Sequence, residues 1–121
     1  MYTNDLLATV VTTNNLISPA LLADRLRITQ VELAASLGLS RDSVSKKARL
    51  ETRKTQTRLR DMLEIVNRVV PWCGSELAAF AWYRSQALPS FGDRTAEALV
   101  VEGQAAAVKR YLDRIAEGGH A

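Results

Sequence analysis

The stretch "TQVELAASLGLSRDSVSKKARLETRKTQTRLR", residues 29–60, begins as an amphipathic segment and becomes densely basic after Ser40. Thr29 and Glu32 form the T-x-x-E pattern of a capping box, in which each side chain satisfies a backbone N–H at the start of a helix. This pattern predicts a helix over residues 29–37. Gly38 follows, and glycine most readily adopts the positive φ that ends a helix.

A second helix is expected to follow after only three residues. Ser40 can accept a hydrogen bond from an unpaired amide, so it is expected to cap a helix over residues 41–49. Two helices joined by "GLS" must cross at a steep angle, which is the spacing of a helix-turn-helix, whose second helix enters the major groove of DNA. Small and apolar side chains occupy the positions where the two helices meet: Leu33, Ala34, Leu37, Leu39 and Val44.

The positive charge of the chain is concentrated beside this pattern. The formal net charge is +3, whereas residues 41–60 alone hold eight basic and two acidic residues, so the rest of the chain carries −3. Such a concentration indicates an anionic partner, and together with the helix spacing it predicts binding to operator DNA. A helical hairpin with a solvated cationic face is the alternative, because Lys47 stands where such motifs usually have an apolar residue.

The predicted DNA contacts divide by side-chain chemistry. Arg41 and Lys46 can donate to guanine O6 and N7, while Ser43 and Ser45 can reach bases or phosphates. Ser40, at the start of the same helix, belongs to this predicted surface. The other predicted contacts position the protein on phosphates without reading sequence: Thr29, Gln30, Arg49, Lys54 and Arg58.

Two segments precede this region. Ser18 and Pro19 form a cap and first-turn pair that opens a helix through about Arg27. Residues 1–17 are compatible with a short strand, a helix or a loose arm, and the sequence does not choose among them.

A longer helix is predicted over residues 57–70. Its apolar residues recur with helical spacing along one buried stripe, and Pro71 is expected to end it. Ile65 lies off this stripe, as an oligomer contact or as a single exposed isoleucine. The stripe consists of Leu59, Met62, Leu63, Val66, Val69 and Val70.

The C-terminal half predicts three short helices. Ser75 opens a helix through about Ala87, with Leu77, Phe80 and Ala81 on its inner face and with Trp82 and Tyr83 pointing elsewhere.

Asp93 is expected to cap a helix of two turns that Gly103 ends, and the last helix covers residues 104–117. The fold class is therefore all-α. The predicted domains are an N-terminal arm, a helix-turn-helix domain and a small helical C-terminal domain, over residues 1–17, 18–70 and 71–121.

Composition limits the function classes. The chain has 121 residues, and Cys73 is its only cysteine, so neither an internal disulfide nor a thiolate metal cluster can form, and a reducing compartment, the cytoplasm, is expected. No apolar run reaches the roughly 18 residues of a membrane helix, and no membrane partner is expected. The single histidine, His120, has no catalytic partner near it, so an enzyme, a metal site and a cofactor are not expected.

The C-terminal sequence "AWYRSQALPSFGDRTAEALVVEGQAAAVKRYLDRIAEGGHA", residues 81–121, resembles the toxin-binding domain of the Xre/MbcA/ParS antitoxin family. Residues 19–70 resemble the Xre-like helix-turn-helix domain that precedes it in that family. The ordered features that carry the C-terminal resemblance are Trp82, Leu88-Pro89, Phe91-Gly92, Arg94-Thr95-Ala96, the break at Gly103, and Leu112 with Ile115 ahead of a glycine.

This resemblance implies an antitoxin that pairs with a RES-type or ADP-ribosyltransferase-like toxin and covers the NAD cleft of that toxin. It also implies a transcriptional repressor of its own operon, as a homodimer within a hetero-oligomeric toxin–antitoxin complex. A stand-alone helix-turn-helix regulator whose C-terminal half only dimerises is the alternative. The toxin contacts that the resemblance implies are Trp82, Arg94, Tyr111, Arg114, Gly118, Gly119 and His120.

Overall fold

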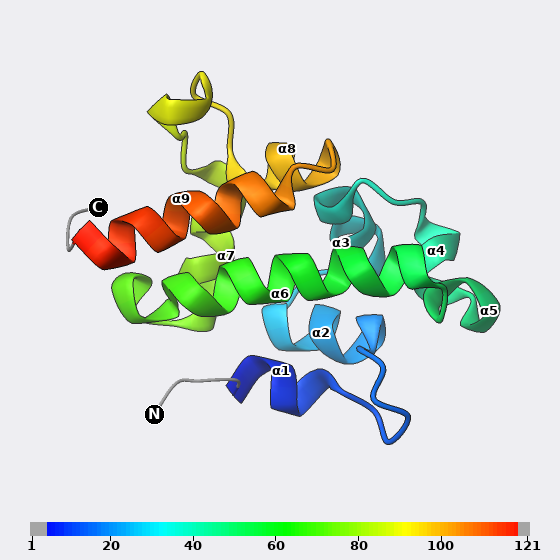
Figure 1. Cartoon of the computed structure of the whole chain (residues 1–121). Helices are drawn as coiled ribbons and strands as arrows, with labels where there is room; N and C mark the ends of the chain where they lie inside the picture. The colour runs from blue at the N-terminus through cyan, green and yellow to red at the C-terminus, as the bar shows by residue number, and fades with distance from the viewer. Residues whose placement is uncertain (1–4, 119–121) are drawn as a thin grey trace.

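In the computed structural model, which describes residues 5–118, helices follow one another with short connections (Figure 1). No strand occurs within this range, and isolated antiparallel bridges join Val11 to Ile17 and Leu88 to Arg94. The all-α prediction is confirmed. The elements are α1 (Asp5–Val10), α2 (Pro19–Leu26), α3 (Gln30–Leu37), α4 (Arg41–Ser45), α5 (Lys47–Leu50), α6 (Arg53–Cys73), α7 (Glu76–Ser85), the 3-10 turn η1 (Pro89–Phe91), α8 (Ala96–Val101) and α9 (Ala105–Gly118).

The longest helix, α6, lies at the centre of the molecule, with α1 and α2 on one side and α9 along another (Figure 1). The predicted apolar stripe of this helix is buried throughout. Ile65 is buried as well, so it is neither an oligomer contact nor an exposed residue. The expectation for Ile65 was wrong because neighbouring helices cover α6 on more than one side, which a single-stripe reading does not anticipate.

Helix α6 continues past the proline that was predicted to end it. Proline lacks an N–H and removes one hydrogen bond, yet Val69 and Val70, on the turn that contains Pro71, remain packed in the core. The helix ends at Gly74, whose left-handed backbone lets its N–H donate to the Val70 carbonyl at 2.8 Å. The predicted domain boundary at residue 70 therefore falls inside a helix.

The segment before α2 belongs to the core. Helix α1 and the bridge that follows it bury Leu6, Val10 and Ile17. The side chain of Gln56 holds this segment in place, because it accepts from the Ile17 N–H at 2.8 Å and donates to the Ile17 carbonyl at 3.0 Å and the Leu50 carbonyl at 2.8 Å. Of the conformations left open for this part of the chain, the structure contains a helix followed by a closed loop.

Helices α2, α3 and α4 confirm the predicted start signals. Ser18 caps α2, the Thr29–Glu32 capping box is complete, and Ser40 caps α4. Gly38 ends α3 at φ +68°. The residues predicted to lie between α3 and α4 are buried, apart from a half-buried Leu39.

The predicted helix over residues 41–49 is divided in two. Lys46 has an extended backbone at φ −85° and ψ 125°, which separates α4 from α5. Lys46, Lys47 and Arg49 are all exposed, so no apolar side chain anchors this part of the helix until the half-buried Leu50. Repulsion between neighbouring cations adds to the cost of a continuous helix.

Two expectations for the C-terminal half need correction. Helix α7 buries Ala79, Phe80 and Tyr83, whereas Leu77 and Ala81 are exposed, so its inner face is rotated from the predicted one. Thr95 rather than Asp93 caps α8, because the Thr95 hydroxyl accepts from the Ala98 N–H at 3.0 Å. Asp93 instead occupies a left-handed turn at φ +66°.

The helix-turn-helix and the C-terminal helices share one hydrophobic core. The Tyr83 hydroxyl of α7 donates to the Ser36 carbonyl of α3 at 2.8 Å, and both groups are buried. Gly38 lies so close to α8 that a Cβ on it would be 2.8 Å from Val101 Cγ1. The turn of the motif is therefore packed directly against the C-terminal half.

Candidate binding surfaces

Unpaired cations gather where α4, α5 and the start of α6 meet. Arg41, Lys46, Arg49 and Lys54 are exposed, and none of them forms an ion pair within residues 5–118. They come from α4, the break after it, α5 and the first turn of α6, which meet at one end of the molecule (Figure 1). Free guanidinium and ammonium groups gathered in this way can neutralise phosphates.

Some of the hydroxyl groups that are predicted to contact DNA form hydrogen bonds within the protein. Thr29 Oγ1 accepts from the Glu32 N–H at 3.0 Å. In return the Thr29 N–H donates to the Glu32 carboxylate at 2.9 Å, which lowers the pKa of that carboxyl. Ser40 Oγ accepts from the Ser43 N–H at 3.3 Å and lies 3.0 Å from Ser43 Oγ. Ser45 Oγ donates to the Arg41 carbonyl at 2.9 Å.

Two other residues of the predicted DNA surface are less available. Gln30 is half-buried at the first turn of α3 and lines a small groove together with Ser45. Arg58, predicted to neutralise phosphate, donates instead to the Leu37 carbonyl at 2.6 Å. Its guanidinium satisfies a carbonyl at the end of α3, which is a structural task within the motif.

A groove of about 500 Å³ opens between the end of α6, the loop around η1, and α9. Trp82 and Tyr111, both predicted contacts, lie in its lining. Phe91 packs edge-to-face on Tyr111 with ring centroids 5.7 Å apart, and the Arg114 guanidinium lies 5.9 Å from the centre of the Tyr111 ring. The structure therefore brings together three of the residues that the family resemblance singled out.

The other predicted contacts are dispersed or lie outside the described residues. Arg94 is exposed and forms an ion pair with Glu102, next to the end of α8. Gly118 is the last residue of α9. Gly119 and His120 lie outside the described residues.

Ion pairs fix α9 along α6. Lys109 Nζ lies 2.8 Å from Asp61 and 3.3 Å from Glu64, and Arg68 pairs with Asp113 at 2.8 Å. Burial disfavours the charge of Lys109, yet the hydrogen bond and the negative charges outweigh it and raise the pKa of Lys109 above its usual value. This stabilisation is complete at neutral pH and is lost only as the pH rises through that raised pKa.

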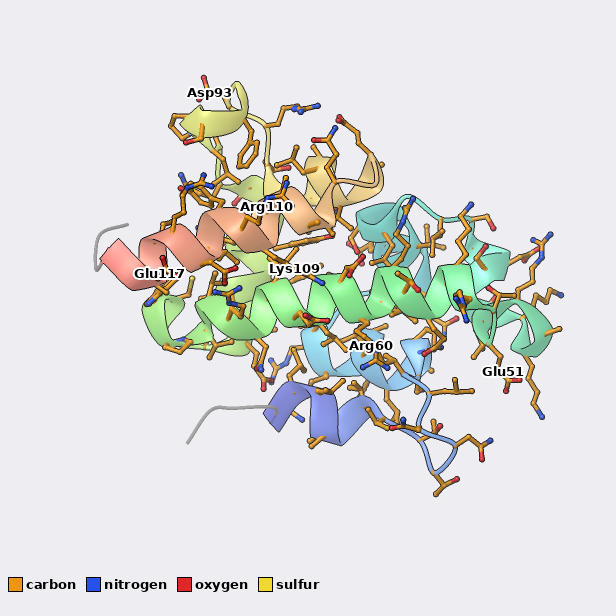
Figure 2. All side chains as sticks on the ribbon, viewed as in Figure 1. Glu51, Arg60, Asp93, Lys109, Arg110 and Glu117 are labelled. Atoms are coloured by element: carbon orange, nitrogen blue, oxygen red, sulfur yellow. The ribbon has the colours of Figure 1, made fainter. Side chains whose placement is uncertain are left out.

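Figure 2 shows Lys109 between α9 and α6, while Arg110 lies on another side of α9. Arg110 and Arg114 are exposed and form no ion pair within the described part of the chain. The α9 face that does not contact α6 therefore offers two free guanidinium groups.

The metal-ligating side chains and the cysteine thiol of residues 5–118 bear on whether this range could hold a catalytic site. This range holds no cluster of three or more His, Cys, Asp or Glu side chains that could bind a metal ion. Burial raises the pKa of the Cys73 thiol, which disfavours the reactive thiolate. None of the helices in this range has the length and apolar character needed to span a bilayer.

One surface residue was missed by the sequence reasoning. Trp72 lines the groove beside Trp82 and Tyr111, and 52% of its surface is exposed. Its place off the apolar stripe of α6 was the available signal, because a large aromatic side chain on the outer side of an amphipathic helix is a frequent interface residue.

Comparison with known families assigns this half of the molecule. Residues 66–118 match the family model described as the antitoxin Xre/MbcA/ParS C-terminal toxin-binding domain. No curated protein and no solved structure matches the chain. The match begins inside α6 and includes the groove, the η1 loop and all of α9. Residues 66–118 therefore form a C-terminal toxin-binding domain of the Xre/MbcA/ParS antitoxin type.

Proposed function

We propose that this antitoxin neutralises a toxin that consumes NAD or transfers ADP-ribose from it, of the RES type or the ADP-ribosyltransferase-like type, by covering its NAD cleft. The observation that carries the proposal is the position of Arg114. It lies beside Tyr111 on the toxin-binding domain, is exposed, and has no ion-pair partner in the described residues.

A guanidinium forms strong bidentate hydrogen bonds with carboxylates and phosphates, so Arg114 could bind a carboxylate at the cleft of the toxin or the phosphates of a bound dinucleotide. The end of α9 leads into the sequence "GGHA", and glycine permits close approach of a backbone to a partner. Gly118, Gly119 and His120 are therefore the proposed insertion, with Arg94 as a further contact at the side.

We also propose that the antitoxin represses its own operon through the helix-turn-helix. The support is the group of exposed cations Arg41, Lys46, Arg49 and Lys54 on α4, α5 and the start of α6, together with the caps of α3 and α4. The break at Lys46 makes α4 short, so base reading would rest on its first residues, Arg41 and Ser43. A stand-alone regulator is less well supported, because it leaves the toxin-binding domain without a partner.

The two proposed functions use different surfaces of the molecule, but these surfaces belong to the same fold. Because α6 crosses residue 70 and the core is continuous, we propose that both binding surfaces belong to one folded body. Homodimer formation within a toxin–antitoxin complex in the cytoplasm remains part of the proposal.

Inhibition of the toxin is the direct test of the first proposal. Purified cognate toxin, encoded by a neighbouring gene, is expected to lose NAD consumption when the full chain is added at equimolar concentration. Arg114→Glu should restore NAD consumption, because the carboxylates or phosphates that the guanidinium binds would repel a glutamate. Undiminished NAD consumption with the unaltered full chain would contradict the proposal.

DNA binding has its own test. Arg41→Ala should weaken operator binding by about 1–3 kcal/mol and relax the preference at one base pair, because it removes a bidentate base contact. Lys54→Ala should weaken operator and random duplex alike and reduce the salt dependence of binding. Titrations of both duplexes at several salt concentrations measure these effects. Equal losses on both duplexes for Arg41→Ala would argue against base reading.

A further inference from the structure

The groove between the end of α6, the η1 loop and α9 has a mainly apolar lining without charged side chains. Its aromatic and aliphatic members belong to the domain matched by the family model, as do its two polar members. Three further grooves take half or more of their lining from residues before 66. The lining consists of Trp72, Trp82, Gln86, Ala87, Leu88, Pro89, Ser90, Tyr111 and Ile115.

We propose that this groove is a docking site for a protruding apolar segment of the toxin, in addition to the contact at the NAD cleft. This inference rests on the proposed neutralisation of a toxin. Docking in the groove would add a second contact between the toxin and this chain. An apolar occupant follows from the lining, since burying a charge among uncharged side chains without a partner is costly.

The exposed indole of Trp72 is the main source of binding energy in this proposal. About half of its surface faces water, at 52% exposure, although Trp82 and Tyr111 in the same groove are partly buried against the core. Covering such an indole removes a large apolar area from water, and tryptophan is enriched among residues that dominate interface affinity.

The shape of the site favours the toxin over a second copy of this chain. A two-fold interface places the same patch of both subunits face to face. Two hollow surfaces in that arrangement leave each other unfilled, whereas a projecting segment fills one. A volume of about 500 Å³ lies in the range of pockets that enclose a compact ligand.

Binding of the cognate toxin to the whole 121-residue chain tests the proposal. Trp72→Ala is expected to weaken the affinity by roughly 10- to 100-fold, mainly through faster dissociation. Leu77→Ala is the matched control, because Leu77 is 43% exposed on the adjacent α7 and does not line the groove. It should change the affinity less than about two-fold.

A second variant fills the groove instead of truncating it. Ser90 is exposed and lines the groove, so Ser90→Trp should occupy the space while leaving Trp72 in place, and it should weaken toxin binding to a similar extent. Circular dichroism and thermal unfolding verify that each variant is folded. At saturating concentration both variants should still abolish NAD consumption, because the contact at the NAD cleft is intact.

The outcomes separate docking from neutralisation. If the unaltered chain inhibits the toxin while Trp72→Ala and Ser90→Trp bind as tightly as it does, docking in the groove is refuted and neutralisation stands. If Trp72→Ala changes the mass of the free chain in light scattering but not its toxin affinity, the occupant is a second copy and the proposal fails. An unaltered chain that does not inhibit the toxin refutes neutralisation itself.

Discussion

Replacing Gly38 with alanine is expected to lower the free energy of unfolding by about 2–4 kcal/mol. Two costs combine at this position. The backbone has φ +68°, which disfavours any residue with a Cβ, and the new Cβ would lie 2.8 Å from Val101 Cγ1. Valine is β-branched and has few alternative rotamers, so the contact is relieved mainly by separating α3 from α8. Chemical denaturation of both proteins measures the difference.

The chain contains a matched control for this substitution. Gly92 has the same φ of +68°, but a Cβ there would meet nothing within 4 Å, so Gly92→Ala should cost only about 1 kcal/mol. Shortening Val101 to alanine in the Gly38→Ala background should recover part of the steric cost. Equal losses at Gly38 and Gly92 would show that α8 does not press on the turn of the helix-turn-helix.

Replacing Tyr83 with phenylalanine should lower the free energy of unfolding by about 1–3 kcal/mol, because the buried Ser36 carbonyl loses the hydrogen bond from this hydroxyl. Burial raises the pKa of Tyr83, so the hydroxyl stays protonated and donates at every pH at which the protein is studied. Tyr111→Phe is the control, since the Tyr111 hydroxyl forms no hydrogen bond within residues 5–118 and its removal should change stability little. Thermal unfolding followed by circular dichroism compares them.

The same unfolding experiment tests whether the helix-turn-helix and the C-terminal helices unfold together. Because Tyr83 of α7 holds α3, both halves should unfold in one cooperative transition in the unaltered chain and in Tyr83→Phe. Separate transitions for the helix-turn-helix and the C-terminal helices would contradict the continuous core.

Local signals were read correctly from the sequence. The caps at Ser18, Thr29, Ser40 and Ser75 are present because each depends on a side chain and an amide a few residues away. The end of α3 at Gly38 follows for the same reason. These features need no knowledge of the rest of the molecule.

The sequence-based predictions were wrong where contacts between segments distant in the sequence determine the structure. Helix α7 has apolar residues around much of its circumference, and the positions of α6 and α8 determine that Tyr83 rather than Leu77 is buried. Packing of Val69 and Val70 carries α6 beyond residue 70. The burial of α1 likewise depends on α6, to which Gln56 ties the following loop.

At the candidate sites, the sequence correctly indicated which kinds of side chain are present. It did not show which of them are free to contact a partner. The exposed cations near α4 could be identified from charge alone, but the commitment of Arg58 to the Leu37 carbonyl could not. The groove was not foreseen, because Trp72, Pro89 and Tyr111 are brought together only by the folding of α6, η1 and α9.

A structure of this chain bound to its cognate toxin would show which surface of the chain lies at the NAD cleft. We expect the end of α9, with Arg114, to lie at the NAD cleft of the toxin, while the cations around α4 remain free for DNA. An open NAD cleft, with the end of α9 facing solvent, would contradict it.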